Sequence, residues 1–440
     1  MNCSVCGVEV LAAKDHTAAE QTDCTVAVNC SVCGEVVHAA KDHAYANGTC
    51  TICGAEEPSK RLDIRGVNRA KSLSLKDVIY VNVTVGFTDS TGLVNATGLT
   101  KEYILANAKV LFWGNDLTDE SAAVLGTEKY QKTLAFSKTY SDGIDEYKTQ
   151  SEGIAAKEFK NKIYYRTYIE LDGEVYYGDL IEYSVVDYCV NQINSTKTTV
   201  KQNNLRALCA AMLNFGAAAQ LDLEYQMDDL ANDLLPSLVE SGKLDAKYLT
   251  LDLDESTLPS AKAPAESMTV NFAVNDASIT AKSLSLKGAI EVNITVGHKF
   301  NGKVASALAE GATLTYYFWT SDTYESLFAS GTALTKENAD YTKSTLNEGE
   351  VIASSYSTKY GQEYKAKPQS IAAKDLDETF YVVAIVTEAD GTEYCTGVEG
   401  YSPMQYAINQ LGKDSAKATL KNLCRWMAVY CEAAETYLSN

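Results

Sequence analysis

The chain contains one stretch of sequence twice. Residues 70–76 read Ala-Lys-Ser-Leu-Ser-Leu-Lys, and residues 79–86 read Ile-Tyr-Val-Asn-Val-Thr-Val-Gly. Residues 281–287 and 290–297 repeat both blocks at the same spacing, with Glu291 in place of Tyr80 and Ile294 in place of Val83. Such fidelity predicts two tandem copies of one module. Repeated modules more often extend a protein or bind a partner than catalyse a reaction.

Composition and charge narrow the class of protein. The chain has 440 residues, of which 46% are hydrophobic and 22% charged, as in ordinary globular proteins. Its formal net charge of -20 opposes nucleic-acid binding, which depends on Lys and Arg displacing counterions. No apolar run approaches the roughly 18 residues of a membrane-spanning helix. We therefore expect no nucleic-acid partner and no membrane insertion.

The first module, residues 62–225, begins with strand patterns and ends with helical ones. Ile79–Phe87 alternates apolar and polar residues, as a half-buried strand does. Ala108–Trp113 and Lys162–Leu171 are further strand candidates, and Asp172-Gly173 indicates a tight hairpin turn. Residues 183–193 and 205–220 change to the helical period. This predicts a β-rich module with a helical hairpin packed on the sheet.

The second module, residues 269–440, repeats that plan element by element. Its matching segments are Tyr317–Trp319 for Leu111–Trp113, Ile371–Lys374 for Ile154–Lys157, Asp390-Gly391 for Asp172-Gly173, and helical patterns at 401–411 and 420–427. Residues 226–268 between the modules are acidic and turn-rich. That composition and length predict a linker between two separate units.

An arm of residues 1–58 precedes the modules and has its own repeat. It holds seven of the 12 cysteines and three of the four histidines. Each unit presents C-x2-C-x9-H followed by a later cysteine, a set typical of structural zinc sites. The candidate ligands are Cys3, Cys6, His16 and Cys24 in the first unit and Cys30, Cys33, His43, Cys50 and Cys53 in the second.

The second unit leaves two ligand assignments open. Cys50-Thr-Ile-Cys53 is a third knuckle, so Cys30, Cys33, Cys50 and Cys53 also have the spacing of a four-cysteine zinc ribbon, without His43. Disulfide bonds are the alternative to zinc, but an odd number of cysteines cannot all pair within the arm. In either assignment the zinc is structural, because protein atoms fill all four positions. A segment this short also needs such a staple to fold.

The modules offer little that indicates catalysis. Cys209 and Cys424 occupy equivalent helical positions, where buried thiols commonly act as small apolar residues. A Cys189–Cys209 bridge is possible, although Ala407 replaces Cys189 in the second copy. His298 is the only histidine of the modules, and Phe87 is its counterpart. With no catalytic motif present, we expect a protein that is not an enzyme.

The arm and the repeated blocks together resemble parts of large secreted or wall-attached proteins of anaerobic gut bacteria. The string Asp23-Cys-Thr to Cys53-Gly54 resembles their zinc-ribbon-like repeats. Ser72–Lys76 with Leu213–Gln220 resembles a tandem module of uncharacterised function that accompanies those repeats. The resemblance implies an extracellular or cell-wall-attached location. It also implies that the chain is a piece of a longer protein whose signal and anchor lie outside it.

A second resemblance concerns the fold. Ala373–Val386 is similar to the strand entry of fibronectin type III domains, in which a Leu turn leads into a Tyr-containing central strand. We therefore expect a mainly β protein: two tandem immunoglobulin-like or fibronectin-III-like β-sandwiches, each followed by a helical hairpin. A compact α+β domain is the alternative.

These observations favour a binding protein. Duplication, acidity, the 28 tyrosines and the lack of a catalytic motif predict a surface adhesion protein. Its partner would be a host extracellular glycoprotein, a glycan or an immunoglobulin, the last bound as by a superantigen. The rival prediction is a carbohydrate-active enzyme or its accessory module, in which Trp113 and Trp319 would stack on sugar rings.

Overall fold

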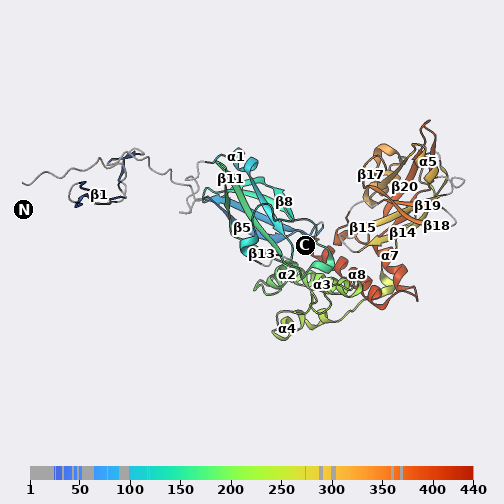
Figure 1. Cartoon of the computed structure of the whole chain (residues 1–440). Coiled ribbons are helices and arrows are strands. Elements are labelled where there is room, and N and C mark those ends of the chain that lie inside the picture. The colour runs from blue at the N-terminus through green and yellow to red at the C-terminus, as the bar shows by residue number, and fades with distance from the viewer. Residues whose placement is uncertain are drawn as a thin grey trace, which may run out of the picture. The chain divides into compact units, whose positions relative to one another are not determined.

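The computed structural model describes most of the two modules and parts of the arm. The described residues are 24, 26–31, 34–41, 44–46, 49–51, 64–76, 78–88, 99–115, 117, 119–272, 274–286, 291–298, 304–357, 361–366 and 370–439. The chain divides into two compact units, Met1–Ile64 with Thr88–Gly98, and Arg65–Phe87 with Leu99–Asn440. Each unit is described by itself below, with element labels as in Figure 1.

The smaller unit contains two short antiparallel hairpins in its described part. They are β1 (Val28–Asn29) with β2 (Val36–His38), and β3 (Tyr45–Ala46) with β4 (Thr49–Cys50). A turn between β1 and β2 forms where the Gly34 amide donates to the Cys30 carbonyl at 2.9 Å. Gly34 has φ +78°, a conformation that glycine adopts at little cost. Of the knuckle predicted at Cys30–Gly34, the described residues Cys30 and Gly34 are thus joined by a backbone hydrogen bond.

The first module consists of two antiparallel sheets followed by helices. One sheet has the order β5-β6-β10-β9, and the other has the order β12-β11-β7-β8 with β13 also paired to β11. The strands are β5 (Arg65–Leu73), β6 (Val81–Thr88), β7 (Ala108–Trp113), β8 (Tyr130–Thr133), β9 (Ala135–Thr139), β10 (Asp145–Gln150), β11 (Ile163–Leu171), β12 (Glu174–Tyr177) and β13 (Ile181–Tyr183). The helix α1 (Lys101–Asn107) precedes β7. The strands predicted near 79–87, 108–113 and 162–171 are therefore present.

The two sheets of this module approach closely where a glycine replaces a side chain. A Cβ atom on Gly66 of β5 would lie 1.8 Å from Oγ1 and 2.6 Å from Cβ of Thr167 on β11. The Tyr165 hydroxyl of β11 also donates to Asn68 of β5 at 2.7 Å. Such contacts bury the facing side chains, and Val83 and Val110 are 0% exposed. Burial of apolar surface of this kind is the main favourable term in folding.

The second module has the same strand order as the first. Its sheet path is β17-β16-β20-β21-β14-β15-β19-β18, with β22 paired to β20. The strands are β14 (Val274–Ser285), β15 (Glu291–His298), β16 (Thr313–Trp319), β17 (Tyr341–Ser344), β18 (Val351–Ser357), β19 (Gly361–Ala366), β20 (Phe380–Thr387), β21 (Glu393–Cys395) and β22 (Glu399–Tyr401). A parallel contact of β14 with β21 at Cys395 joins the two halves, which are separate sheets in the first module. The duplication read from the sequence is thus a duplication of topology.

Tight turns and short helices connect these strands. The turn predicted at Asp172-Gly173 joins β11 to β12, and both residues have positive φ, 52° and 81°. Such turns match the right-handed twist of the strands. The second module also contains α5 (Val304–Ala309) and α6 (Ser321–Ala329). Short 3₁₀ helices η3 (Ala156–Glu158) and η7 (Ala373–Asp375) lie at matching positions of the two modules.

Each module ends in the helical pair that the sequence predicts. The pairs are α2 (Val185–Ile193) with α3 (Val200–Asp222), and α7 (Pro403–Leu411) with α8 (Ala418–Leu438). The side chains of Ser184 and Ser402 cap α2 and α7 by accepting the amides of Asp187 and Gln405 at 3.0 Å. A serine at this position satisfies an amide that has no partner within the helix. The first helix of each pair therefore begins in the same way.

Helices α3 and α8 pack against each other and join the two modules. The rings of Phe215 and Tyr430 stack with centroids 5.4 Å apart. Asn204 donates to the Thr436 carbonyl at 3.3 Å, and Thr419 donates to Asp222 at 2.8 Å at the other end of the contact. The start of α3 therefore meets the end of α8, so the two helices are antiparallel. Helix α3 is buried on nearly all sides because it contacts α2, η3 and α8.

Residues 226–268, predicted as a linker, contain structure of their own. They form α4 (Leu235–Glu240), η4 (Ala246–Leu249) and η5 (Glu255–Thr257), and they bury Leu235, Leu238 and Leu244. Asn214 of α3 donates to the Tyr248 carbonyl at 2.9 Å. Glu255 pairs with Arg425 of α8 at 2.5 Å. This segment therefore contacts the helices of both modules, in contrast to a solvated spacer.

In the described part of the chain, no helix has both the length and the apolar character that crossing a membrane requires.

Candidate functional site

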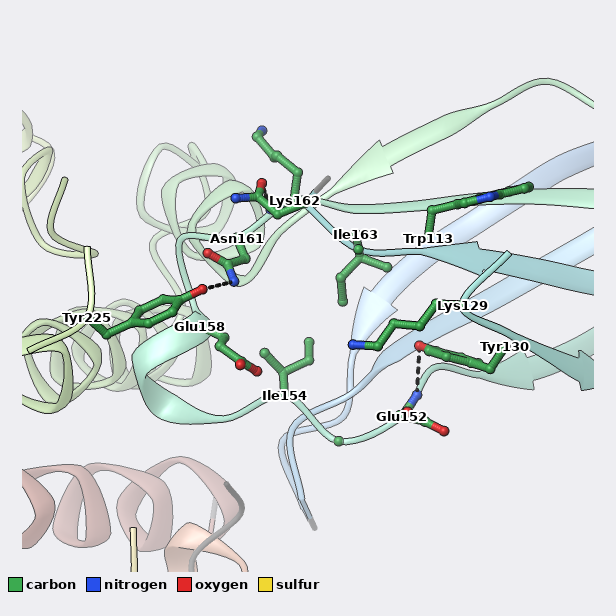
Figure 2. A pocket seen from close by; sticks show the side chains of 13 residues that line it. Trp113, Lys129, Tyr130, Glu152, Ile154, Glu158, Asn161, Lys162, Ile163 and Tyr225 are labelled. Carbon is green, nitrogen blue, oxygen red and sulfur yellow. Dashed lines mark hydrogen bonds between the residues drawn. The ribbon is translucent and has the colours of Figure 1, made fainter. Parts of the chain in front are cut away.

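A pocket of about 270 Å³ lies in the first module, between the end of the sheet and the helices (Figure 2). Its walls come from the end of β7, the start of β8, the segment leading into η3, the start of β11 and the turn that follows α3. The lining residues are Trp113, Gly114, Asn115, Lys129, Tyr130, Glu152, Gly153, Ile154, Glu158, Asn161, Lys162, Ile163 and Tyr225. Segments more than 100 residues apart in the sequence thus build one cavity.

Three aromatic side chains line this pocket. Trp113 is 6% exposed, and its indole N–H donates to Thr127 Oγ1 at 3.1 Å, so the ring is fixed in place. The Tyr130 hydroxyl accepts the Glu152 amide at 3.1 Å. Tyr225, just beyond α3, lies under the Lys157 ammonium at 4.9 Å from its ring centroid. The Tyr130 ring stacks on Phe112 with centroids 5.0 Å apart, and Trp113 packs in a core cluster with Leu111, Ala123 and Tyr168, so contacts outside the cavity hold both rings.

The polar groups of the pocket include both charges and amides. Asn161 Nδ2 donates to the Tyr225 hydroxyl at 2.7 Å. Asn161 Oδ1 is buried without a hydrogen-bond partner among the described residues, which costs free energy unless a further group supplies a donor. Lys162 pairs with Glu182 at 2.8 Å and with Asp187 at 2.9 Å. Its ammonium is therefore a fixed positive charge at the edge of the cavity.

Burial shifts the ionisation of one tyrosine of the pocket, Tyr130. Burial raises the pKa of Tyr130 to about 12, although its hydrogen bond from the Glu152 amide acts in the opposite direction. The phenol is protonated at neutral pH, so its O–H can donate a hydrogen bond to a ligand. Lys129 and Glu152 are exposed at the rim, so they meet a ligand before it enters.

This arrangement suits the binding of a small polar molecule. Ligand pockets combine apolar and aromatic walls with a few convergent polar groups that fix orientation. Aromatic faces and neighbouring hydroxyl, amide and charged groups complement the two kinds of surface of a sugar ring. The two carboxylates, Glu152 and Glu158, come from the same wall segment. Glu152 is exposed and therefore lacks the apolar surroundings of a typical general acid.

The second module has a pocket at the corresponding place, with different chemistry. It has a volume of about 310 Å³ and is lined by Val78 of the first module and, among others, by Asp322, Lys374, Asp375, Glu378 and Phe380 of the second. Glu378 and Phe380 correspond to Asn161 and Ile163 of the first module by the matched segments. Burial, with the nearby charges of Asp375 and Asp322, raises the pKa of Glu378. The two modules thus share a pocket at this position, but different polar groups line it.

The predicted zinc ligands of the arm are placed only in part. Cys3, Cys6, His16, Cys33, His43 and Cys53 lie outside the described residues. Cys24, Cys30 and Cys50 are described, and all three are buried. The sulfur atoms of Cys24 and Cys50 are 3.5 Å apart, far longer than a disulfide bond. The contact joins a cysteine of the first predicted unit to one of the second, a grouping that the spacing did not indicate.

The other candidate residues from the sequence analysis do not line this pocket. Trp319 is 0% exposed and donates to Asn338 at 2.9 Å, so it belongs to the core. His298 is the last residue of β15, opposite Ala277. Cys189 and Cys209 are 0% exposed free thiols, and burial followed by the neighbouring Cys209 raises the pKa of Cys189. These cysteines are therefore unreactive core residues in this structure.

Comparisons with known proteins do not assign a family. No family model matches the chain, and no curated protein matches it. A solved structure described as "Biofilm associated protein - BSP domain" is similar at 8% sequence identity, with a TM-score of 0.15. The match covers 78% of this chain and 59% of that one. With so low a score, the likeness carries no weight for fold or function.

The sequence did not single out most residues of the pocket. Trp113 was a candidate, but Tyr130, Asn161 and Tyr225 were not, because they lie on three different segments. The one available signal was the difference between the copies. Asn161 corresponds to Glu378, and such a change at an otherwise matched segment marks a surface that the two copies use differently.

Proposed function

We propose that the chain is a non-enzymatic part of an extracellular or cell-wall-attached bacterial protein that binds a host glycan or glycoprotein. The pocket of the first module would hold one sugar residue. The observation that carries this proposal is the grouping in one pocket of the Tyr225 ring, the Tyr130 hydroxyl and the Asn161 amide, whose buried oxygen has no hydrogen-bond partner among the described residues. The acidic pocket at the matching place in the second module supports a specific role for the first.

The finer features of the fold and the arm belong to the same proposal. We propose that the two-sheet modules are immunoglobulin-like or fibronectin-III-like sandwiches with appended helices. The paired sheets of matching strand order support this assignment. We also propose that structural zinc folds the arm, which the approach of Cys24 to Cys50 supports. An immunoglobulin remains the alternative partner of the adhesion surface.

A glycan array probed with the full chain tests the proposal. We expect binding to a limited set of glycans, which Lys129→Ala and Asn161→Ala weaken about tenfold, the equivalent of losing one charged or buried hydrogen bond. Asp322→Asn, in the second-module pocket, is the matched control and should bind as the unchanged chain does. Loss of binding in Asp322→Asn alone would move the site to the second module. No retained glycan from any array would refute sugar binding.

The rival function, a carbohydrate-active enzyme, rests on Glu152 and Glu158 in one pocket. Paired carboxylates are the usual catalytic groups of glycoside hydrolases. The bound glycans from the array are the appropriate substrates for a turnover assay. Release of a sugar that Glu158→Gln abolishes would favour the enzyme, and binding without turnover would favour adhesion.

A further inference from the structure

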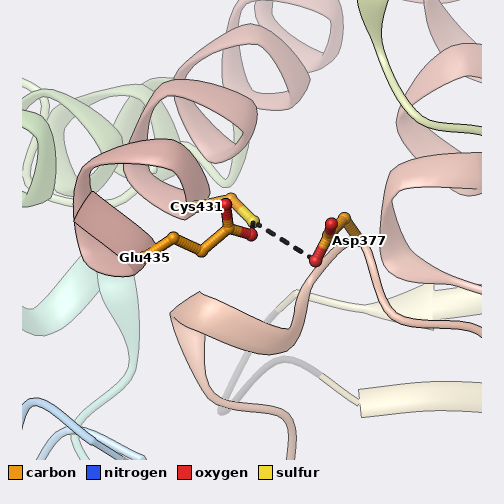
Figure 3. A group of neighbouring side chains, drawn as sticks. All are labelled: Asp377, Cys431 and Glu435. Carbon is orange, nitrogen blue, oxygen red and sulfur yellow. Dashed lines mark hydrogen bonds between the residues drawn. The ribbon is translucent and has the colours of Figure 1, made fainter. Parts of the chain in front are cut away.

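Within the second module, a side-chain cluster of mixed ligand type connects the last helix to the segment that follows η7. Cys431 and Glu435 are one turn apart on α8, and Asp377 follows η7 (Figure 3). One ligand atom of each residue lies within 4.8 Å of the others. The Cys431 sulfur is 3.4 Å from Glu435 Oε1 and 4.0 Å from Asp377 Oδ1. A thiol and two carboxylates from two elements thus converge on one point.

The first module shows what the same place looks like without such a cluster. By the matched segments, Lys160 corresponds to Asp377, Gly216 to Cys431 and Gln220 to Glu435. Lys160 pairs there with Asp229 at 2.9 Å, and Gln220 accepts the Ala231 amide at 2.8 Å. At all three positions the second module has a residue that can bind a metal ion and the first module does not. A cation, a glycine and a neutral amide are replaced by three groups that ligate metal ions.

The cluster in the second module has no opposite charge to balance it. Among the described residues, neither Asp377 nor Glu435 forms an ion pair, and Lys262, which feels the charge of Asp377, pairs with Glu325. Cys431 is 3% exposed, and its sulfur lies beside side-chain oxygens of both Asp377 and Glu435. Burial and then the charge of Asp377 raise the pKa of Glu435. Anionic groups brought together in this way stabilise a bound cation.

The spacing fits a tetrahedral ion of the size of zinc. With Zn–S near 2.3 Å and Zn–O near 2.0 Å, the sulfur and oxygen ligands of a tetrahedral site lie about 3.5 Å apart. The two observed sulfur–oxygen distances, 3.4 and 4.0 Å, bracket that value. A thiolate among carboxylates disfavours Ca²⁺ and Mg²⁺, which prefer oxygen ligands alone. Both carboxylates are half-buried, so water can reach the fourth position.

We propose that Asp377, Cys431 and Glu435 bind a borderline divalent cation, Zn²⁺, with water as the fourth ligand. Binding forms one metal–sulfur and two metal–oxygen bonds and releases the thiol proton to solvent, without any redox step. The ion attaches α8 to the segment after η7. The site shares no residue with the predicted ligands of the arm or with the pocket of the first module.

Zinc binding by the full chain tests this proposal. After removal of metal with a chelator and dialysis against Zn²⁺, the bound equivalents are counted by elemental analysis. We expect one equivalent more in the unchanged chain than in Cys431→Ser or Asp377→Lys, the latter placing the lysine of the first module. Cys424→Ser removes another buried thiol of α8 and should retain the full count. The zinc of the arm contributes equally to all these chains.

A second measurement distinguishes loss of the metal site from poor folding of a variant. Glu435→Gln changes a half-buried residue, and circular dichroism in the metal-free state should match the unchanged chain. Its weakest Zn²⁺ equivalent should bind at least about 100-fold more weakly, since even losing an outer partner of a ligand costs 10–100-fold. An equal zinc count and affinity in Glu435→Gln and the unchanged chain would overturn the proposal. Loss of one equivalent in Cys424→Ser as well would also overturn it.

Discussion

The stack of Phe215 on Tyr430 offers a direct test of how the two modules are joined. Both rings are nearly inaccessible, at 2% and 4% exposed, and their centroids are 5.4 Å apart across the α3–α8 contact. Tyr430→Ala removes a buried ring and leaves a cavity that the two helices cannot fully close. Substitutions of this kind cost about 3–5 kcal/mol of the free energy of unfolding.

Urea unfolding of the full chain, followed by circular dichroism of the helices, measures that loss. We expect Tyr430→Ala to lower the unfolding free energy of the helical transition by about 3–5 kcal/mol. A double-mutant cycle with Phe215→Ala should give a coupling of about 0.5–1.5 kcal/mol for the ring pair. Phe328→Ala is the matched control, because Phe328 is 43% exposed and should cost far less.

Two results would refute the reasoning. The first is a loss in Tyr430→Ala no larger than that in Phe328→Ala, which would mean that α8 does not bury the ring against α3. The second is zero coupling in the cycle, which would mean that the two rings act independently. Either outcome would favour two modules that do not pack on each other, as the sequence predicts.

Three further predictions concern other parts of the modules. Gly66→Ala should destabilise the chain by about 1–3 kcal/mol, since its Cβ would overlap Thr167, whereas Gly397→Ala, with open space around it, should be nearly neutral in the same thermal melt. Glu378→Gln should raise the melting temperature at pH 7 but not at pH 4. The raised pKa of this carboxyl means that its stabilising contribution is full below its unfolded pKa of about 4.5 and is lost as pH rises through the folded value. An equal shift at both pH values would contradict this. Cys424, whose pKa burial raises to about 12, should resist a maleimide at pH 7.5 until denaturant is added, as peptide mass spectrometry would record; rapid labelling of the folded chain would disprove its burial.

Much of the secondary structure could be predicted from short-range patterns. The alternation at Ile79–Phe87 and the Asp172-Gly173 turn predicted strands and a hairpin that are present at β6 and between β11 and β12. The helical pairs also appear where the period changes. These predictions succeed because hydrophobic period and turn preference depend on residues only a few positions apart.

The candidate sites could be predicted only in fragments. The differences between the copies marked His298 against Phe87 and Cys189 against Ala407, whereas Asp377, Cys431 and Glu435 come together only in the folded chain. The spacing in the arm grouped Cys24 with the first unit, whereas its sulfur lies beside that of Cys50. The acidic segment 226–268 gave a linker signature, yet three of its leucines, Leu235, Leu238 and Leu244, are buried. Composition gives the average polarity of a segment, but it does not predict which of its few apolar residues are buried in the folded chain.

The sequence by itself determined that this protein is a duplicated, β-rich module with helical ends and a cysteine-rich arm. Tertiary structure alone decided that α3 packs on α8, that Tyr225 meets Asn161 in one pocket, and that Asp377 meets Cys431. The partners in these contacts are tens to hundreds of residues apart, as with Asn204 and Thr436 at 232 positions. Which of these residues meet in space depends on which apolar faces bury each other. That outcome depends on the packing of the whole chain and not on neighbouring residues in the sequence.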